Sequence, residues 1–301
     1  MPYLETIIQN DDLPFRTLTR LLAEMQTTIN AAGLRLFDGD FDRFVIFALV
    51  VREGLGNAAG PRPISAHSLS ISLNRSFETV RRHVNALIDA GYCQRVKGGV
   101  IAAPGVVERE DVGAVLRLAN DAFVRFVEDF QGARAPRDMP VAPPSRGPDL
   151  AIGVCGAVDI MLSTVESNRG HYRDWLDLTI FSTVLCGNSR RYARDGEALG
   201  LPLNETHALR PSVIARVLGL AETTVRRRTA RLTQPGGPLT RVRRGLLVSR
   251  AWLSTMAAAE TTARTQEHVR REIRKAVARG FPIHAPATAY IDGRPPAAEF
   301  D

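Results

Sequence analysis

The chain has 301 residues, of which 45% are hydrophobic and 24% are charged, as in an ordinary soluble globular protein. It has 39 Lys and Arg residues against 32 Asp and Glu residues, and this net charge of +7 favours an anionic partner, nucleic acid before a membrane surface. Its longest apolar run, Phe44 to Val51, is far shorter than the roughly 20 residues of a membrane-spanning helix, so we expect no membrane partner.

The length predicts about two domains, each with a core of its own. Five prolines fall between residues 134 and 149, a stretch that favours an extended conformation and cannot continue a helix. We therefore expect an N-terminal domain at 1–133, a linker at 134–149 and a C-terminal domain at 150–281. Residues 282–301 are rich in Pro and Ala, which predicts a disordered tail.

The first patterned segment begins with a short helix that carries Leu69 and Leu73 on one face. The pair Asn74-Arg75 breaks this period, and Ser76 is a good N-cap for the helix that follows. In that second helix, Val80, Val84 and Leu87 have the i, i+4, i+7 spacing of a buried face. A hairpin across Lys97-Gly98-Gly99 is expected next.

The same pattern recurs in the second half of the chain. The segment Leu73 to Arg82 reads LNRSFETVRR, and Leu218 to Arg227 reads LGLAETTVRR. Here Val225, Thr229 and Leu232 take the buried positions, but Ala221 stands where Ser76 caps the first copy. A second basic hairpin is expected around Gly245, so we interpret the pattern as a duplicated domain.

A long apolar stripe follows each hairpin. In the first copy it contains Val112, Val115, Leu116, Ala119, Phe123, Phe126, Val127 and Phe130. In the second copy it contains Trp252, Met256, Ala263, Val269, Ile273 and Val277. Both stripes predict helices that either pack in the core or form a homodimer interface.

Both patterned segments resemble the winged helix-turn-helix of bacterial transcription regulators, over roughly residues 41–104 and 175–249. The resemblance implies a mainly α-helical fold with small β-hairpin wings, built as tandem winged helix-turn-helix domains. It also implies that the second helix of each motif lies in the major groove of double-stranded DNA, while the wing touches the backbone or the minor groove.

The exposed residues of the two motifs are the candidate DNA contacts. Arginine suits this role because its planar fork can pair with guanine or clamp a phosphate, whereas Thr79 and Thr224 are suited to donate to phosphate. The candidates in the first copy are Ser76, Phe77, Glu78, Thr79, Arg81, Arg82, Asn85, Arg95 and Lys97. Those in the second copy are Glu222, Thr223, Thr224, Arg226, Arg227, Arg228, Arg231, Arg241, Arg243 and Arg244.

The basic charge is concentrated on these motifs. Residues 210–250 hold ten Arg and one acidic residue, and residues 62–97 hold six basic and two acidic residues. A solvated helix face would explain one isolated Arg pair, but it does not explain this concentration.

Other kinds of site fail on spacing. The glycines between Gly54 and Gly60 are followed by prolines where a phosphate-binding helix should begin, and the acidic run from Asp38 lacks the glycine and final carboxylate of a calcium loop. The three cysteines form no metal-binding pattern, and no secretion signal precedes the first helix. We expect no cofactor, no metal, no enzymatic activity and a cytoplasmic, nucleoid-associated location.

The leading hypothesis is a sequence-specific, double-stranded DNA-binding transcriptional regulator with two recognition helices, reading an asymmetric site or a direct repeat. One alternative is a plasmid or phage replication initiator, and another is a non-enzymatic winged-helix scaffold in chromosome organisation. The position of the binding site would separate the first two, and the concentrated basic charge argues against the third.

Overall fold

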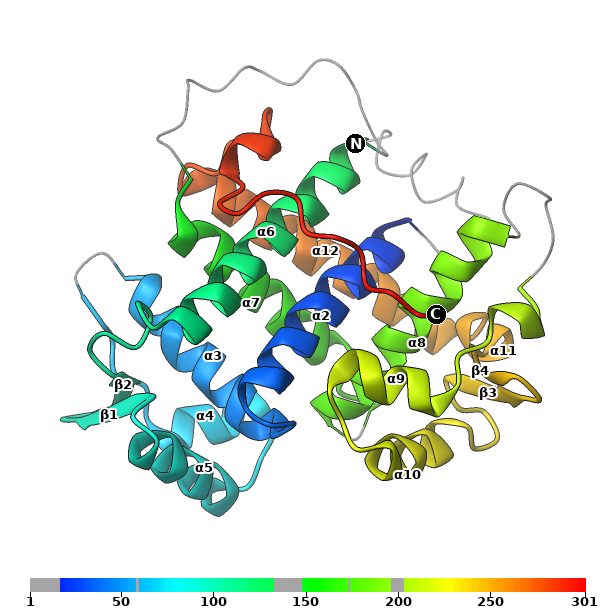
Figure 1. The fold of residues 1–301 in the computed structure, drawn as a ribbon, viewed down its shortest axis with the longest axis horizontal. Helices are drawn as coiled ribbons and strands as arrows, with labels where there is room; N and C mark the ends of the chain where they lie inside the picture. Colours follow the sequence, from blue (N-terminus) through cyan, green and yellow to red (C-terminus); the bar gives the residue numbers. More distant parts are fainter. Residues whose placement is uncertain (1–16, 58–59, 133–147, 173, 196–202) are drawn as a thin grey trace.

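The structure is a computed structural model that describes residues 17–57, 60–132, 148–172, 174–195 and 203–301. It is 65% helical and contains two small antiparallel hairpins (Figure 1), so the predicted mainly α-helical fold with small β-hairpins is confirmed.

The elements follow one another in the same order in both halves. The first half contains α2 (Thr17–Leu36), α3 (Phe41–Leu55), α4 (Ala66–Leu73), α5 (Phe77–Asp89), β1 (Cys93–Val96), β2 (Gly99–Ala102) and α6 (Glu110–Gly132). The second half contains α7 (Leu150–Ser167), α8 (Trp175–Asp195), η2 (Glu205–His207), α9 (Pro211–Leu218), α10 (Glu222–Leu232), β3 (Leu239–Val242), β4 (Gly245–Val248), α11 (Arg250–Leu253), α12 (Met256–Ala278) and η3 (Pro286–Ala289).

The duplication extends beyond the stretch in which the sequence pattern is visible. Helices α4 and α9 have eight residues each and end at left-handed residues, Asn74 with φ 50° and Gly219 with φ 67°. Helices α6 and α12 have 23 residues each. The hairpins share one register, with Cys93 opposite Ala102 and Leu239 opposite Val248. Helices α2 and α7 therefore stand as the matching first helices of two repeats.

Each hairpin also pairs with the segment that precedes the short helix of its repeat. Ile64 bridges Val100 in the first repeat, and Leu209 bridges Leu246 in the second. The backbone approaches so closely here that a Cβ on Gly99 would lie 2.3 Å from the Ile64 carbonyl oxygen. Only glycine fits this position, and Gly245 is in the same situation against Leu209.

The two halves share one hydrophobic core, so the prediction that each half has its own core is wrong. Helix α2 packs against α6 and α8, and α7 packs against α6, α12 and α3. Glycines on α7 permit this, since a Cβ at Gly156 would lie 2.7 Å from the Phe123 ring. Helix α7 is the one described helix long and apolar enough to span a membrane, but 67% of it is buried inside the protein.

The stripes that follow the hairpins belong to this core. On α6, Phe123 and Phe126 are fully buried. On α12, Val269 and Ile273 are buried as predicted, but Met256 is 78% exposed and Ala263 is exposed as well, so the predicted stripe is wrong at these two positions. The reason is that the buried face of α12 runs from Ala258 through Thr261 and Thr265 to Val269, and Met256 and Ala263 lie off this face. The buried residues of both stripes contact helices of the same chain, and the homodimer stays a prediction.

The C-terminal residues are ordered, so the prediction of a disordered tail at 282–301 is wrong. The Asn120 side chain donates to the Ala289 carbonyl at 3.0 Å, and Arg191 donates to the Phe300 carbonyl at 2.5 Å. Phe300 is only 4% exposed. The burial of the Phe300 side chain and the hydrogen bonds to the backbone carbonyl groups stabilise an ordered tail in spite of its Pro-rich composition. Residues 134–147 of the predicted linker lie outside the described residues.

Candidate nucleic-acid interface

The second helices of the two motifs, α5 and α10, have the predicted buried faces. Val80, Val84 and Leu87 are buried on α5, and α10 buries Val225, Thr229 and Leu232. The Ser76 hydroxyl accepts from the Thr79 amide at 3.1 Å and so caps α5. Ala221 supplies no capping side chain, yet α10 begins at the equivalent position. Packing of the apolar face therefore fixes the start of α10 without a cap.

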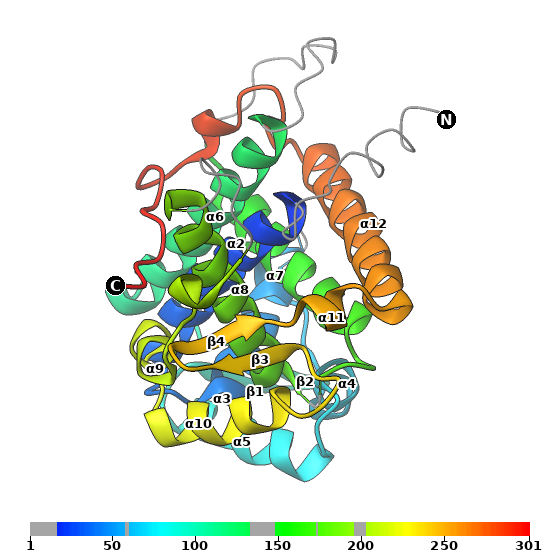
Figure 2. The same cartoon turned by 90° about the vertical axis from the view of Figure 1, so that its right-hand side faces the viewer.

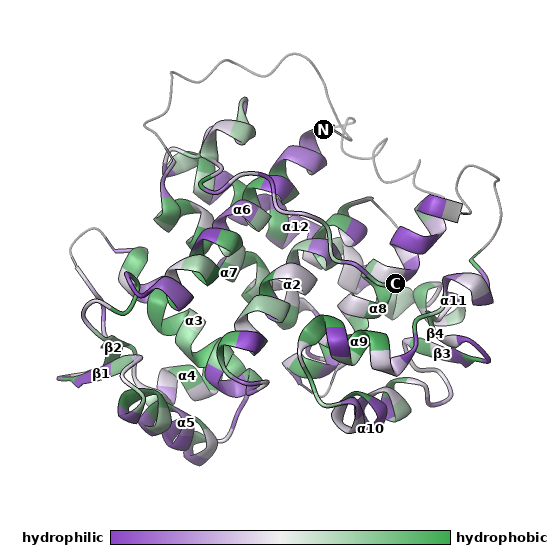
Figure 3. Ribbon diagram, in the orientation of Figure 1, coloured by the Kyte–Doolittle hydropathy of each residue, from purple (hydrophilic) through white to green (hydrophobic). Residues whose placement is uncertain are grey.

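The opposite faces of α5 and α10 are polar, whereas α3, which packs on α5, and α9, which packs on α10, are more hydrophobic (Figure 3). Arg81 pairs with Glu78 at 2.6 Å, and Arg226 pairs with Glu222 at 2.6 Å. The hydrogen bond from Arg81 also holds the pKa of Glu78 below its usual range. Two arginines on this surface, Arg82 and Arg227, are exposed and make no ion pair with any described residue.

The remaining candidates at the helix starts vary in exposure. Phe77 is 51% exposed, which is unusual for a large aromatic side chain. The Ser76 and Thr79 hydroxyls lie 2.7 Å apart and are engaged in the cap of α5. Thr223 is exposed, whereas Thr224 is half-buried. Phe77 and Thr223 therefore face solvent at the start of the two helices.

The hairpins add basic side chains beside these helices. Arg95 donates to the Asn85 side chain at 2.7 Å, which ties the first hairpin to α5. The other hairpin cations are exposed and form no ion pair within the described part of the chain; they are Lys97, Arg241, Arg243 and Arg244. With Arg82 and Arg227, they make a set of six unpaired cations, which we call the free cations.

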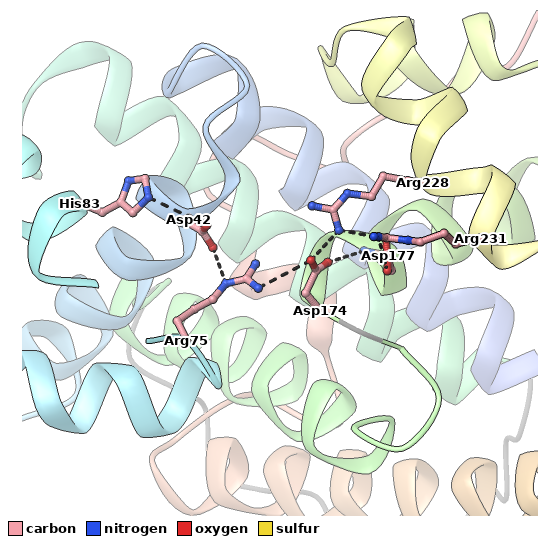
Figure 4. Close-up of polar contacts among 7 residues, drawn as sticks. All are labelled: Asp42, Arg75, His83, Asp174, Asp177, Arg228 and Arg231. Atoms are coloured by element: carbon pink, nitrogen blue, oxygen red, sulfur yellow. Dashed lines mark hydrogen bonds and ion pairs between the residues drawn. The ribbon is translucent and has the colours of Figure 1, made fainter. Parts of the chain in front are cut away.

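Two of the predicted DNA contacts, Arg228 and Arg231, form ion pairs within the protein instead. Arg228 points into the protein, where it pairs with Asp174 at 2.5 Å and with Asp177 at 3.0 Å (Figure 4). Arg231 pairs with the same Asp177 at 2.9 Å. Asp177 is only 2% exposed, so these arginines neutralise a buried carboxylate. We therefore remove Arg228 and Arg231 from the candidate contact surface.

The same network crosses from one repeat to the other. Arg75, in the turn before α5, lies 2.8 Å from Asp42 and 3.6 Å from Asp174 (Figure 4). Burial works against the charged form of Asp174, but its hydrogen bond and ion pair with Arg228 outweigh burial and hold its pKa below the usual range. The turn before α5 and the second half of α10 are thus linked through charged side chains of low exposure.

Sequence reasoning missed this network, although the repeat contained a signal for it. His83 of α5 lies 3.5 Å from Asp40, the N-cap residue of α3. Arg228 of α10 occupies the matching position and contacts Asp174, immediately before α8. An aligned pair of basic and acidic residues in both copies indicates a contact that both copies make.

Other chemistry has little support in the described residues. No group of three or more His, Cys, Asp or Glu side chains there could hold a metal ion. Burial raises the pKa of the Cys93 thiol to about 12, and it also raises the pKa of Cys155 and Cys186. All three cysteines are buried and free. Thiols of this kind are poor nucleophiles because they are seldom ionised.

The two helices and the two hairpins lie on one side of the molecule. In Figure 1 they occupy the lower edge, and the view turned by 90° in Figure 2 keeps α5 and α10 on that edge. No known family model, curated protein sequence or solved structure matches the chain. This surface is therefore distinguished by its geometry and charge alone.

Proposed function

We propose that each repeat is a winged helix-turn-helix domain and that the protein is a sequence-specific, double-stranded DNA-binding transcriptional regulator. The observation that carries this proposal is the placement of the free cations. They lie on α5, on α10 and on the hairpins beside them, all on one edge of the molecule. In the proposed complex, α5 and α10 enter major grooves and the hairpins contact the backbone.

The chemistry of the exposed side chains suits the proposed contacts with bases and phosphates. Arg82 and Arg227 form no ion pair with the described residues that would have to break before they bind a base edge or a phosphate. Arg81 and Arg226 are held by Glu78 and Glu222, so each pair would be oriented before contact. The exposed ring of Phe77 suits apolar contact with a thymine methyl group.

Binding to duplex DNA tests this proposal directly. We would select sequences from a pool of random 40-base-pair duplexes with the full-length protein, and measure affinity for the enriched sequence by fluorescence anisotropy. The double variant Arg82→Ala/Arg227→Ala should bind about 100-fold more weakly, because two base or phosphate contacts are lost. The control is Arg274→Ala, an exposed arginine on α12, which should bind normally.

Equal losses in the double variant and in the control would contradict the assignment of the surface. Genome-wide mapping of the enriched sequence then addresses the biological role. Sites beside promoters fit a regulator, whereas iterated sites beside a replication origin would point to an initiator instead.

A further inference from the structure

The contacts between the two repeats indicate how the two proposed DNA-reading units are arranged relative to each other, and this arrangement determines the kind of DNA site that they fit. A two-fold axis requires that contacts between the two halves come in reciprocal pairs, whereas a simple translation leaves each contact without a counterpart. The residues at the boundary between the repeats distinguish these two arrangements.

The turns before α5 and α10 make reciprocal contacts. In the first repeat, Arg75 reaches Asp174 just before α8. In the second repeat, the Leu220 side chain and the Gly219 carbonyl lie against Gly39, just before α3, within 3.8 Å of where a Cβ would stand. Each turn therefore contacts the start of the other repeat's second helix.

The long helices of the two repeats also contact each other in reciprocal pairs. Asn30 of α2 donates to Thr179 of α8 at 3.1 Å, and Arg52 of α3 donates to Asp159 of α7 at 2.9 Å. The first helix of each repeat thus packs on the second helix of the other repeat. This is the contact pattern of an intertwined two-fold dimer, built here within one chain.

The order of elements along the lower edge agrees with this symmetry. Figure 1 shows the hairpin β1–β2, then α5, then α10, then the hairpin β3–β4, so that the hairpins lie at the two outer ends. A translation would place one hairpin between the two helices. Two-fold DNA-binding proteins recognise inverted half-sites, because the symmetry of the site mirrors that of the protein.

The side chains that face solvent differ between the repeats. Phe77 of α5 corresponds to Glu222 of α10, and Asn85 corresponds to Ala230. Because these positions face the proposed major groove, the two half-sites have different base sequences. The shared hydrophobic core and the ion pair between Arg75 and Asp174 join the two units, so we expect their separation to be fixed.

From these observations we propose that the protein binds a pseudo-palindrome: two unlike half-sites in inverted orientation at one fixed spacing. The inference rests on the proposed DNA-binding function and specifies its substrate. It replaces the expected direct repeat and keeps the expected asymmetry of the site.

The test uses the full-length protein and the 40-base-pair duplex enriched from the random pool. In one derivative duplex, one half-site is reversed at constant spacing. In another, five base pairs are inserted between the half-sites, which turns one of them to the opposite side of the duplex. Each change should weaken binding about 100-fold, because the base contacts of one unit are lost. A ten-base-pair insertion returns both half-sites to the same side of the duplex but increases the distance between them, so it should also weaken binding; binding as tight as to the original duplex would contradict the fixed spacing.

Single variants assign the half-sites. Arg82→Ala should lose discrimination at one half-site only, and Arg227→Ala should lose it at the other. Enrichment of a direct repeat, or equal binding to the reversed duplex, would overturn the inference and leave the proposed function standing. If no duplex is enriched and none binds at low salt, the proposed function fails, and the inference fails with it.

Discussion

Neighbouring arginines on α10 provide the sharpest test of which side chains contact DNA and which hold the fold together. Arg227 is exposed and unpaired among the described residues, whereas the Arg228 side chain is 17% exposed and contacts two carboxylates. Replacing each one separately by alanine removes the same chemical group from adjacent positions. The two variants should therefore fail in different assays.

The structure sets the expected loss of stability in Arg228→Ala. Removing one partner of a buried ion pair costs about 3–5 kcal/mol of unfolding free energy. Here the loss is smaller, because Asp177 keeps Arg231 at 2.9 Å and Asp174 keeps Arg75 at 3.6 Å. We expect about 2–3 kcal/mol, which lowers the melting temperature of a chain of this length by roughly 3–5 °C. DNA affinity measured well below this temperature should change little.

The Arg227→Ala variant should behave in the opposite way. Its unfolding free energy should stay within about 0.5 kcal/mol of the wild type, since its side chain loses no hydrogen bond or ion pair with the described residues. Its affinity for the selected duplex should fall about tenfold or more, since one phosphate or base contact is lost. Urea unfolding and fluorescence anisotropy measure the two quantities. The reasoning is refuted if Arg228→Ala is as stable as the wild type, or if it loses as much DNA affinity as Arg227→Ala.

Three further predictions follow from local features. Ala221→Ser should stabilise the protein by about 0.5–2 kcal/mol in urea unfolding, because it supplies the missing cap of α10; no change would mean that the serine cannot cap this helix. The pKa of Asp174 is held below its ordinary 3.8, so its contribution to stability is present above that pH and is lost as the pH falls through the lower folded value; acid should therefore destabilise the wild type more than Asp174→Asn. Finally, iodoacetamide at pH 8 should leave all three buried cysteines unmodified in the native protein and label them in urea; rapid native labelling of Cys93 would contradict its burial.

Much of the architecture could be predicted from local patterns. The buried face of α5 and the hairpin at Gly99 follow from helical spacing and turn chemistry within about 25 residues. The repeat then transferred the same prediction to α10 and Gly245. These features depend on neighbours in sequence, so the sequence alone was sufficient for them.

Other features depend on partners that are distant in sequence. Arg228 lies three residues after Val225 and four before Leu232, at the border of the buried face, so helical spacing does not decide its direction. Its carboxylate partners on the α8 side decide it. The ordered tail has the same origin, since Phe300 is buried against elements far upstream. The shared core likewise depends on distant partners, since α2 packs on α8 and α7 packs on α3.

The salt dependence of binding tests the central claim most directly, that the exposed basic face of the two repeats binds the DNA backbone. The affinity for the selected duplex would be measured by anisotropy over a series of salt concentrations. Six free cations that each neutralise one phosphate predict a slope of about −5 for the logarithm of affinity against the logarithm of salt concentration. A slope near zero would contradict the claim, because the free cations would then not contact phosphates.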